Sequence, residues 1–194
     1  HYKLKKVDLI INMFMGGSPE NVKEFYKLKN KIKCYLLEDA CHALGAKYKD
    51  GKYKISIGSC KHSDISVFSF HPLKSITTGE GGAISTNNVK IYRSSLILRN
   101  HGLYKKNFWD YHLVDHSLNF RISDINCALG ISQLKKLNQF VKVRKKIAEV
   151  YYKSFLNEKK IKLPIYNNNN FSAWHLFLIS IDFKNLKEKE IFIK

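Results

Sequence analysis

Short apolar runs separated by turn signals dominate the first half of the chain. Runs over residues 7–13, 34–37, 65–70 and 83–86 have the length and character of strands. The second run leads into Glu38 and Asp39, as at the end of a buried parallel strand. Between these runs, Ser18 as N-cap and Pro19 as first helical residue predict the start of a helix, and residues 88–99 have helical spacing. Strands that alternate with helices predict an α/β sheet.

The pattern changes after residue 99. Residues 102–119 are rich in aromatic and polar side chains without a clear period, and a connection of that length is more often functional than incidental. Ser123 is expected to cap a helix whose apolar spacing resumes toward Tyr151. Residues 167–170 predict a polar loop, His175 to Ile181 predicts a strand, and the last residues predict a helix.

Length and composition set the broad class. The chain has 194 residues, of which 44% are apolar, enough for one packed domain or for one domain and part of another. Its four cysteines have no metal-type spacing, which suits buried thiols in a reduced compartment and predicts no metal site. No stretch has the length of a membrane span and no signal peptide is evident, so we expect a cytoplasmic protein without a membrane partner.

The charge balance raises a second class of function. Lys and Arg number 34 against 16 Asp and Glu, a formal net charge of +18, as in many nucleic-acid-binding proteins. Here the lysines are scattered along the whole chain, whereas a binding surface would concentrate them in one segment or on one face. The scatter indicates a compositional bias, and we expect no nucleic-acid partner.

Two candidate residues follow the predicted strand at residues 34–37. Asp39 stands where open α/β sheets place their ligands, at the carboxyl end of a strand. His42 comes three residues later and would share a face with Asp39 if the segment turns helically. Taken singly, each has a plainer interpretation, because aspartate is common in caps and turns and a lone histidine is usually structural.

Lys74 is the third candidate. It follows a strand and a proline, in a segment with only His71 as another ionisable group. Burial disfavours an ammonium, and a neutral lysine is the nucleophile that forms Schiff bases with aldehydes. Ser69, at the end of the strand, could donate its hydroxyl to a phosphate. Among so many lysines, a solvated surface position is the competing interpretation for Lys74.

The combination of these residues is more specific than any one of them. Residues 38–45 (EDACHALG), 66–74 (SVFSFHPLK) and 77–82 (TTGEGG) resemble the DegT/StrS-like sugar aminotransferases. So do residues 99–102 (RNHG) and 119–121 (NFR), with the helix at 128–134. The resemblance covers most of the chain to about Tyr151. Within the family it is greatest to the transaminases of pseudaminic acid biosynthesis, which aminate C4 of a UDP-linked 4-keto-6-deoxy sugar.

The resemblance implies the architecture. It implies an α/β fold of the pyridoxal 5'-phosphate (PLP)-dependent transferase fold type I, with an incomplete three-layer αβα large domain and the start of a small C-terminal domain. Residues 1–140 would form part of the PLP-binding large domain, and residues 141–194 the linking helix and the start of the small domain. It also implies a homodimer with active sites at the subunit interface, using a nucleotide sugar and an amino-acid donor, with glutamate as the expected donor.

The resemblance also implies a role for each matched residue. Asp39 would pair with the pyridinium nitrogen of PLP, and His42 would lie against the ring or its 3-hydroxyl. Ser69 would bind the phosphate. Lys74 would be the catalytic Schiff-base lysine and then the base that moves the proton. Asn119 would reach the phosphate of the cofactor in the neighbouring subunit.

Several alternatives stay open. A sugar dehydratase of the same family has a histidine where the Schiff-base lysine stands, so Lys74 argues against it. The family's chains extend beyond both His1 and Lys194, so this chain is expected to be an internal part of a longer sequence. The N-terminal phosphate-binding loop of the family would lie in the part that precedes His1. An inactive or regulatory truncated relative is therefore the second hypothesis. An incomplete sheet is expected to expose apolar surface and strand edges. Arg121, beside Asn119, receives no role.

Overall fold

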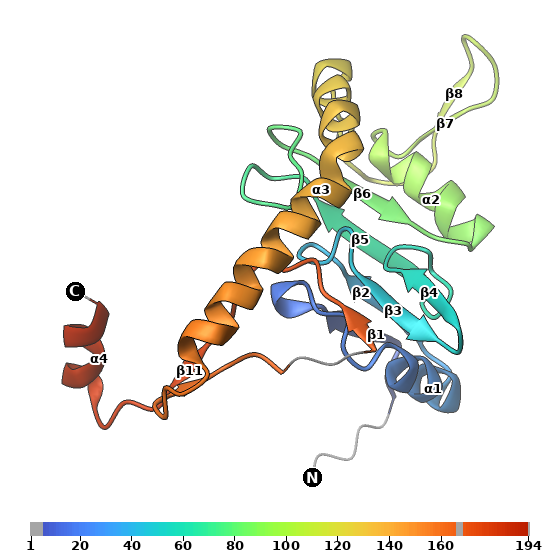
Figure 1. The fold of residues 1–194 in the computed structure, drawn as a ribbon. Helices are drawn as coiled ribbons and strands as arrows, with labels where there is room; N and C mark the ends of the chain where they lie inside the picture. The colour runs from blue at the N-terminus through green and yellow to red at the C-terminus, as the bar shows by residue number, and fades with distance from the viewer. Residues whose placement is uncertain (1–5, 166–168, 194) are drawn as a thin grey trace.

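A computed structural model describes residues 6–165 and 169–193. Figure 1 shows a mixed α/β molecule in which one long helix, α3, crosses beside a central sheet. The helical elements of the described residues are η1 (Met15–Gly17), α1 (Val22–Ile32), α2 (Val89–Arg99), α3 (Asp124–Phe155) and α4 (Leu186–Ile193).

The central sheet has four strands in the order β1-β2-β5-β6. β2 pairs in parallel with both β1 and β5, whereas β6 is antiparallel to β5. The predicted α/β sheet is therefore confirmed, with an antiparallel strand at one edge. The carboxyl ends of the three parallel strands lie along one edge, where ligands of such sheets are bound. The strands are β1 (Leu9–Met13), β2 (Tyr35–Asp39), β5 (Ile65–Ser69) and β6 (Gly82–Ser85).

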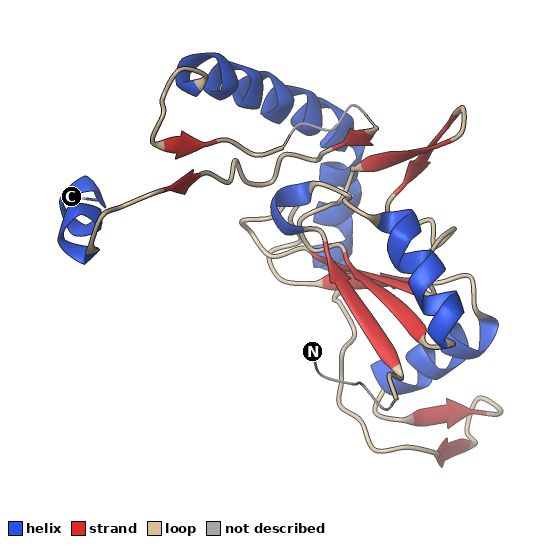
Figure 2. Ribbon diagram, turned by 90° about the horizontal axis from the view of Figure 1, so that it is seen from below, coloured by secondary structure: helices blue, strands red, loops and turns tan. Residues whose placement is uncertain are grey.

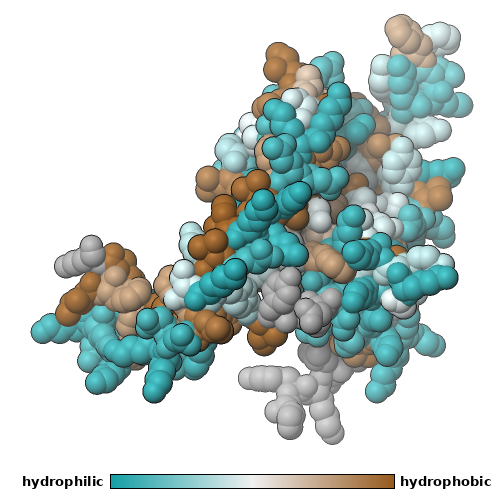
Figure 3. Space-filling model, viewed as in Figure 1, coloured by the Kyte–Doolittle hydropathy of each residue, from teal (hydrophilic) through white to brown (hydrophobic). Residues whose placement is uncertain are grey.

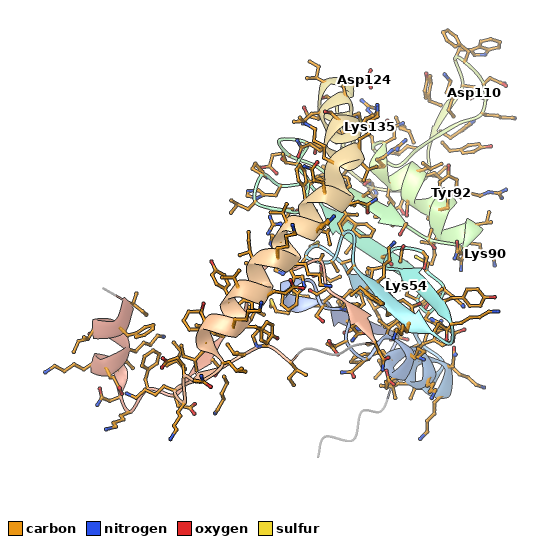
Figure 4. The ribbon with its side chains drawn as sticks, viewed as in Figure 1. Lys54, Lys90, Tyr92, Asp110, Asp124 and Lys135 are labelled. Carbon is orange, nitrogen blue, oxygen red and sulfur yellow. The ribbon has the colours of Figure 1, made fainter. Side chains whose placement is uncertain are left out.

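A second, smaller sheet covers one face of the central one and was not predicted. It has the order β10-β3-β4, all antiparallel, and its C-terminal strand β10 brings a distant part of the chain onto the hairpin. The Nζ of Lys54, on β4, lies 4.5 Å from the ring centroid of Phe171 on β10, across this sheet (Figure 4). The strands are β3 (Lys47–Asp50), β4 (Tyr53–Ser56) and β10 (Asn170–Phe171).

The core lies between the two sheets and the segments that leave the strand ends. Most of its members are small or aromatic, and several are fully inaccessible to solvent. α1 lies on this side as well, because its Lys29 forms an ion pair of 2.7 Å with Asp64 and its Tyr26 ring contacts His62. The buried cluster comprises Phe14, Val22, Ala40, Ala43, Ala46, Tyr48, Ile57 and Ala173, with Ile55, Phe68 and Val141 packed against it.

Three of the sequence expectations need correction. α1 begins at Val22 rather than at Pro19, because the Ser18 hydroxyl bonds to the Glu20 carboxylate and caps no helix. The aperiodic segment 102–119 contains a two-stranded hairpin, β7 (Leu103–Lys105) and β8 (Tyr111–Leu113). The strand expected from His175 to Ile181 is reduced to β11 (Ser180–Ile181), which pairs with β9 (Ile161–Lys162).

Other local predictions are confirmed. The helix expected at residues 88–99 is α2, with Asn88 as its N-cap, and Ser123 caps α3 as expected by accepting from the backbone N–H of Asn126. Residues 77–82, which the glycines mark as a turn, lead into β6 with φ angles of 81° at Gly79 and 156° at Gly81, and are called the glycine turn below. Of the polar loop expected at 167–170, residues 167 and 168 lie outside the described residues.

α3 is continuous over 32 residues and contacts the body of the protein near its start and around its middle. Near its start, Gly130 lies so close to Thr78 that an added Cβ would be 2.7 Å from the threonine methyl carbon. Further along, Val141 packs on Gly45. Figures 1 and 2 show α4 away from this body, at the end of an extended segment.

One face of the central sheet is open to solvent. Leu36 and Glu38 point to the core and are 2% and 3% exposed, whereas alternate residues on the opposite face are exposed, among them Ile11 at 62%, Tyr35 at 56% and Ile84 at 57%. On the surface in Figure 3, hydrophobic side chains also gather along α3 and over α4. The expected exposure of apolar surface is therefore observed. In the part of the chain that the structure describes, no helix has the length and apolarity to cross a membrane.

Candidate active site at the carboxyl edge of the central sheet

Asp39 is the last residue of β2 and stands at the ligand-binding edge of the sheet. Its register neighbours are Met13 on β1 and Val67 on β5. Its Oδ1 accepts a hydrogen bond of 3.1 Å from the backbone N–H of Cys41, which fixes the carboxylate over the turn that follows. The side chain is half-buried. Asp39 therefore presents a negative charge at the position that the sequence predicted.

His42 is brought to the same edge by a sequence of tight turns rather than by a helix. Ala43 and Ala46 are fully buried, and their backbone N–H groups close successive turns on the carbonyls of Ala40 and Ala43. The backbone N–H of Gly16 donates to His42 Nδ1 at 3.4 Å. This donation makes Nδ1 an acceptor, so the neutral imidazole carries its proton on Nε2.

Lys74 lies on the loop between β5 and β6. Ser69 ends β5, and its Oγ accepts from the backbone N–H of His71 at 3.4 Å. The Lys74 N–H then closes a turn on the carbonyl of His71, at 2.9 Å. The two residues after Lys74, Ser75 and Ile76, are buried and hold the loop down, which leaves the lysine half-buried.

Electrostatic effects connect the lysine loop to the turn after β2. Burial lowers the pKa of His42, and the Lys74 ammonium lowers it further, while Asp39 acts in the opposite direction. Burial and then Asp39 raise the pKa of Cys41 to about 11, so this thiol stays protonated near neutral pH. The structure thus brings Asp39, His42 and Lys74 together at one edge, with Ser69 at the end of the adjacent strand.

Asn119 lies elsewhere. It is exposed, forms an isolated antiparallel bridge with Asn100 and accepts, through Oδ1, a hydrogen bond of 3.0 Å from the backbone of Arg121. The Arg121 guanidinium contacts the Asn100 amide oxygen. These contacts of Asn119, within the described residues, involve none of the other four predicted site residues.

Two residues near the site were missed by sequence reasoning. The ring of His175 packs on that of His42, with centroids 4.3 Å apart. Burial lowers the pKa of His175 to about 4, and the charges of His42, Lys74 and Arg144 lower it too. Arg144, on α3, donates from Nη1 to the carbonyl of His175 at 3.1 Å. Neither residue lies in a recognisable motif, and His175 begins the apolar run that predicts a strand to Ile181.

Known proteins are similar to this chain in sequence and fold. A transaminase for UDP-4-amino-4,6-dideoxy-N-acetyl-beta-L-altrosamine from Campylobacter jejuni is 46% identical over 169 residues, which cover 86% of this chain and 42% of that protein. The structure of Helicobacter pylori PseC, described as an aminotransferase involved in the biosynthesis of pseudoaminic acid, matches with a TM-score of 0.86 and 32% identity over 95% of this chain and 48% of that one.

A third structure, the PLP-form of a putative sugar aminotransferase from Streptococcus pneumoniae, has a TM-score of 0.82 and 25% identity over 96% of this chain and 51% of its own. The chain thus spans about half of the length of the relatives that it matches. These matches confirm the predicted fold type I architecture. The model of the DegT/DnrJ/EryC1/StrS aminotransferase family matches residues 5–194, and the chain belongs to this family.

Proposed function

We propose that the protein containing this chain is a PLP-dependent transaminase that transfers an amino group, from glutamate, to C4 of a UDP-linked 4-keto-6-deoxy sugar of the pseudaminic acid type. The observation that carries the proposal is the meeting of Asp39, His42 and Lys74 at the carboxyl edge of the sheet. The names of the similar proteins, two of which refer to this sugar or this pathway, support the substrate class.

The residues at this edge fit pyridoxal phosphate. The cofactor has an aldehyde, a ring nitrogen that works best when protonated, and a phosphate, and these need an amine, a carboxylate and hydrogen-bond donors. Lys74, Asp39 and Ser69 supply the three types from neighbouring strand ends. Buried polar atoms also lack hydrogen-bond partners among the described residues here, namely Ser75 Oγ, next to Lys74, and His175 Nδ1, against His42.

Each residue then has a defined task. When bound, the cofactor supplies an electron sink for the carbanion that transamination requires. Lys74 Nζ would hold the aldehyde carbon, and as a free amine it accepts and returns the proton of the donor amino acid. Asp39 would hold the proton on the ring nitrogen through its negative charge. His42 would orient the ring, and Ser69 would hold the phosphate through its hydroxyl.

The proposal extends to the assembly and to the two regions of the chain. Asn119 would serve the cofactor of a second subunit in a homodimer, which agrees with its exposed position between two exposed apolar residues, Leu118 at 68% and Phe120 at 64%. Residues 1–140 would belong to the large domain, and α3 would link it to the small domain that residues 141–194 begin. A cytoplasmic location is the natural one for an enzyme of nucleotide sugars.

The test uses the full-length protein incubated with pyridoxal phosphate, then reduced with borohydride and digested for mass spectrometry. We expect a yellow protein whose absorbance band depends on pH, and a cofactor adduct on the peptide that contains Lys74. The Lys74→Ala variant should lose both, whereas Lys90→Ala, which changes an outward-pointing lysine of α2 (Figure 4), should keep both. Absence of band and adduct in the unchanged protein would refute the proposal.

A second outcome separates the alternative function. An inactive or regulatory relative could bind the cofactor and yet transfer no amino group. The full-length protein with glutamate and a UDP-linked 4-keto sugar should release 2-oxoglutarate in step with amino sugar. Cofactor binding without either product, over a panel of nucleotide-linked keto sugars, would favour the inactive relative.

A further inference from the structure

Two histidines from distant parts of the sequence pack together beside the lysine loop. The His42 and His175 ring centroids are 4.3 Å apart and the planes are inclined at 38°. His42 follows β2, whereas His175 follows β10, so the contact joins the C-terminal segment to the strand ends. Both imidazoles are close enough to Lys74 for its charge to affect them. His42 is therefore the residue at which the C-terminal segment meets the candidate site.

The backbone that carries His175 is held in an uncommon conformation. Trp174 has a φ of 50°, in the left-handed region, which is strained for a residue with a side chain. Its N–H donates to Ser172 Oγ at 3.0 Å. Arg144 Nη1 reaches the carbonyls of both Trp174 and His175, at 3.4 and 3.1 Å. Such strain persists only where the surroundings fix it, so the position of His175 is strongly determined.

The opposite side of the contact is equally constrained. Ala173 N–H donates to the carbonyl of Gly17 at 2.9 Å, and Leu176 N–H donates to that of Gly16 at 3.1 Å. Gly17 itself has no room for a side chain, because an added Cβ would lie 2.6 Å from the His42 carbonyl oxygen and 3.2 Å from the His175 nitrogen. The turn after β1, the turn after β2 and the C-terminal segment thus meet at Gly17.

We propose that His175, whose backbone is anchored by Arg144, is a positioning residue whose ring holds His42 in the orientation and tautomer needed at the cofactor site. The proposal rests on the proposed function only in taking His42 as a cofactor-contacting residue. The Gly16 N–H selects the tautomer of His42, and the His175 ring prevents the imidazole from turning away from that donor. The charged or titratable groups that act on His175 are His42, Lys74 and Arg144.

The His175 ring would position His42 through its shape rather than through its charge. A cationic ring at 175 would face the ammonium of Lys74 and the guanidinium of Arg144, which disfavours protonation. A neutral aromatic ring of similar shape should therefore replace His175, whereas a small or flexible side chain should not. His175→Phe is the conservative variant, and His175→Ala and His175→Gln are the disruptive ones.

The first measurement reads His42 without any cofactor. In the full-length protein labelled with 15N-histidine, the His42 signals are identified by their loss in His42→Gln. We expect the Nε2–H tautomer in the unchanged protein and in His175→Phe. In His175→Ala and His175→Gln we expect averaged ring nitrogen shifts, typical of exchange between tautomers. His112→Ala, which changes an exposed histidine of β8, serves as the matched control and should leave the His42 signals unchanged.

The second measurement is the Kd for pyridoxal phosphate, from quenching of tryptophan fluorescence. His175→Ala should weaken binding about tenfold, while His175→Phe should stay within about threefold of the unchanged protein. If His175→Ala does not fold, His175→Gln gives the same reading. Unaltered His42 signals in a folded His175→Ala or His175→Gln variant would overturn the positioning role, even if the cofactor binds. If neither the unchanged protein nor any variant binds the cofactor, the proposed function fails. The His42 signals, which are measured without cofactor, still decide whether His175 positions His42.

Discussion

The Ser66 hydroxyl donates a hydrogen bond of 2.5 Å to Oε2 of Glu38, between register partners on adjacent parallel strands. Glu38 directly precedes Asp39, and because successive side chains of a strand point to opposite faces, one carboxyl is buried in the core while its neighbour faces the candidate site. Burial raises the pKa of Glu38, although the hydrogen bond from Ser66 opposes the rise. The pleat of β2 thus places two adjacent acidic residues on opposite faces of the sheet, Glu38 in the core and Asp39 at the candidate site.

The raised pKa predicts how stability depends on pH. The folded protein retains the Glu38 proton to a higher pH than the unfolded chain does, so the free energy of unfolding falls as pH rises from about 4.5 through the raised value. Glu38→Gln, which stays neutral and keeps an acceptor for Ser66, should lose this dependence. Urea unfolding of both proteins at several pH values measures it. Parallel curves of unfolding free energy against pH for the two proteins would contradict the raised pKa of Glu38.

His175 should contribute a dependence of the opposite sign. Its folded pKa of about 4 lies below the ordinary 6.5, so the unfolded chain binds the proton first and the free energy of unfolding falls as pH drops from 6.5 toward 4. His175→Phe should flatten this acid limb by up to about 1.4 kcal/mol per pH unit, the slope for one proton. The same urea series gives the comparison, and an unchanged slope would show that His175 titrates normally.

Asp39→Asn should separate charge from position. The amide oxygen can still accept from the Cys41 N–H, so we expect little change in melting temperature. The loss of the negative charge should reduce kcat by about 100-fold or more, as for other preorganised electrostatic groups. Asp182→Asn, an exposed partner of Lys162, is the control and should keep full activity. An active Asp39→Asn enzyme would remove Asp39 from the site.

Gly17→Ala tests the crowding at the junction of the three segments. Gly17 has a φ of 99°, and its added Cβ would press on the His42 carbonyl oxygen. Gly51 also has a positive φ, 58°, but nothing lies within 4 Å of its added Cβ. We expect Gly51→Ala to cost about 1 kcal/mol through backbone strain alone and Gly17→Ala to cost roughly 2–4 kcal/mol. Equal losses in chemical unfolding would mean that the junction relaxes easily.

Local sequence signals were sufficient for much of the fold. The strands of the central sheet, the helix α2, the cap at Ser123 and the glycine turn all follow from patterns within a few residues. The two hairpins were missed because their strands are only three or four residues long, too short to show a clear alternation of apolar and polar side chains. The start of α1 was misplaced because Ser18 bonds to a nearby carboxylate, a choice that the sequence alone does not reveal.

For the candidate site too, the residues near one another in the sequence could be predicted, and those brought in by long-range packing could not. Asp39, His42, Ser69 and Lys74 follow strand ends within a short part of the sequence, and family motifs single them out. His175 and Arg144 reach the site only because β10 pairs with β3 and α3 returns across the body. That proximity depends on long-range packing, for which a lone histidine in an apolar run gives no signal. The roles of all these residues remain predictions to be measured.

Because α3 is one continuous helix, insertions and deletions within it would shift its contacts with the rest of the protein. The helix contacts the glycine turn through Gly130, the turn after β2 through Val141, and the His175 segment through Arg144. One inserted residue between the first and last of these would rotate Arg144 by about 100° and move it by about 1.5 Å along the axis. Insertions and deletions should therefore be tolerated in the β7–β8 hairpin but not within this stretch of helix. Even one inserted alanine there would prevent Gly130 and Arg144 from making their contacts at the same time.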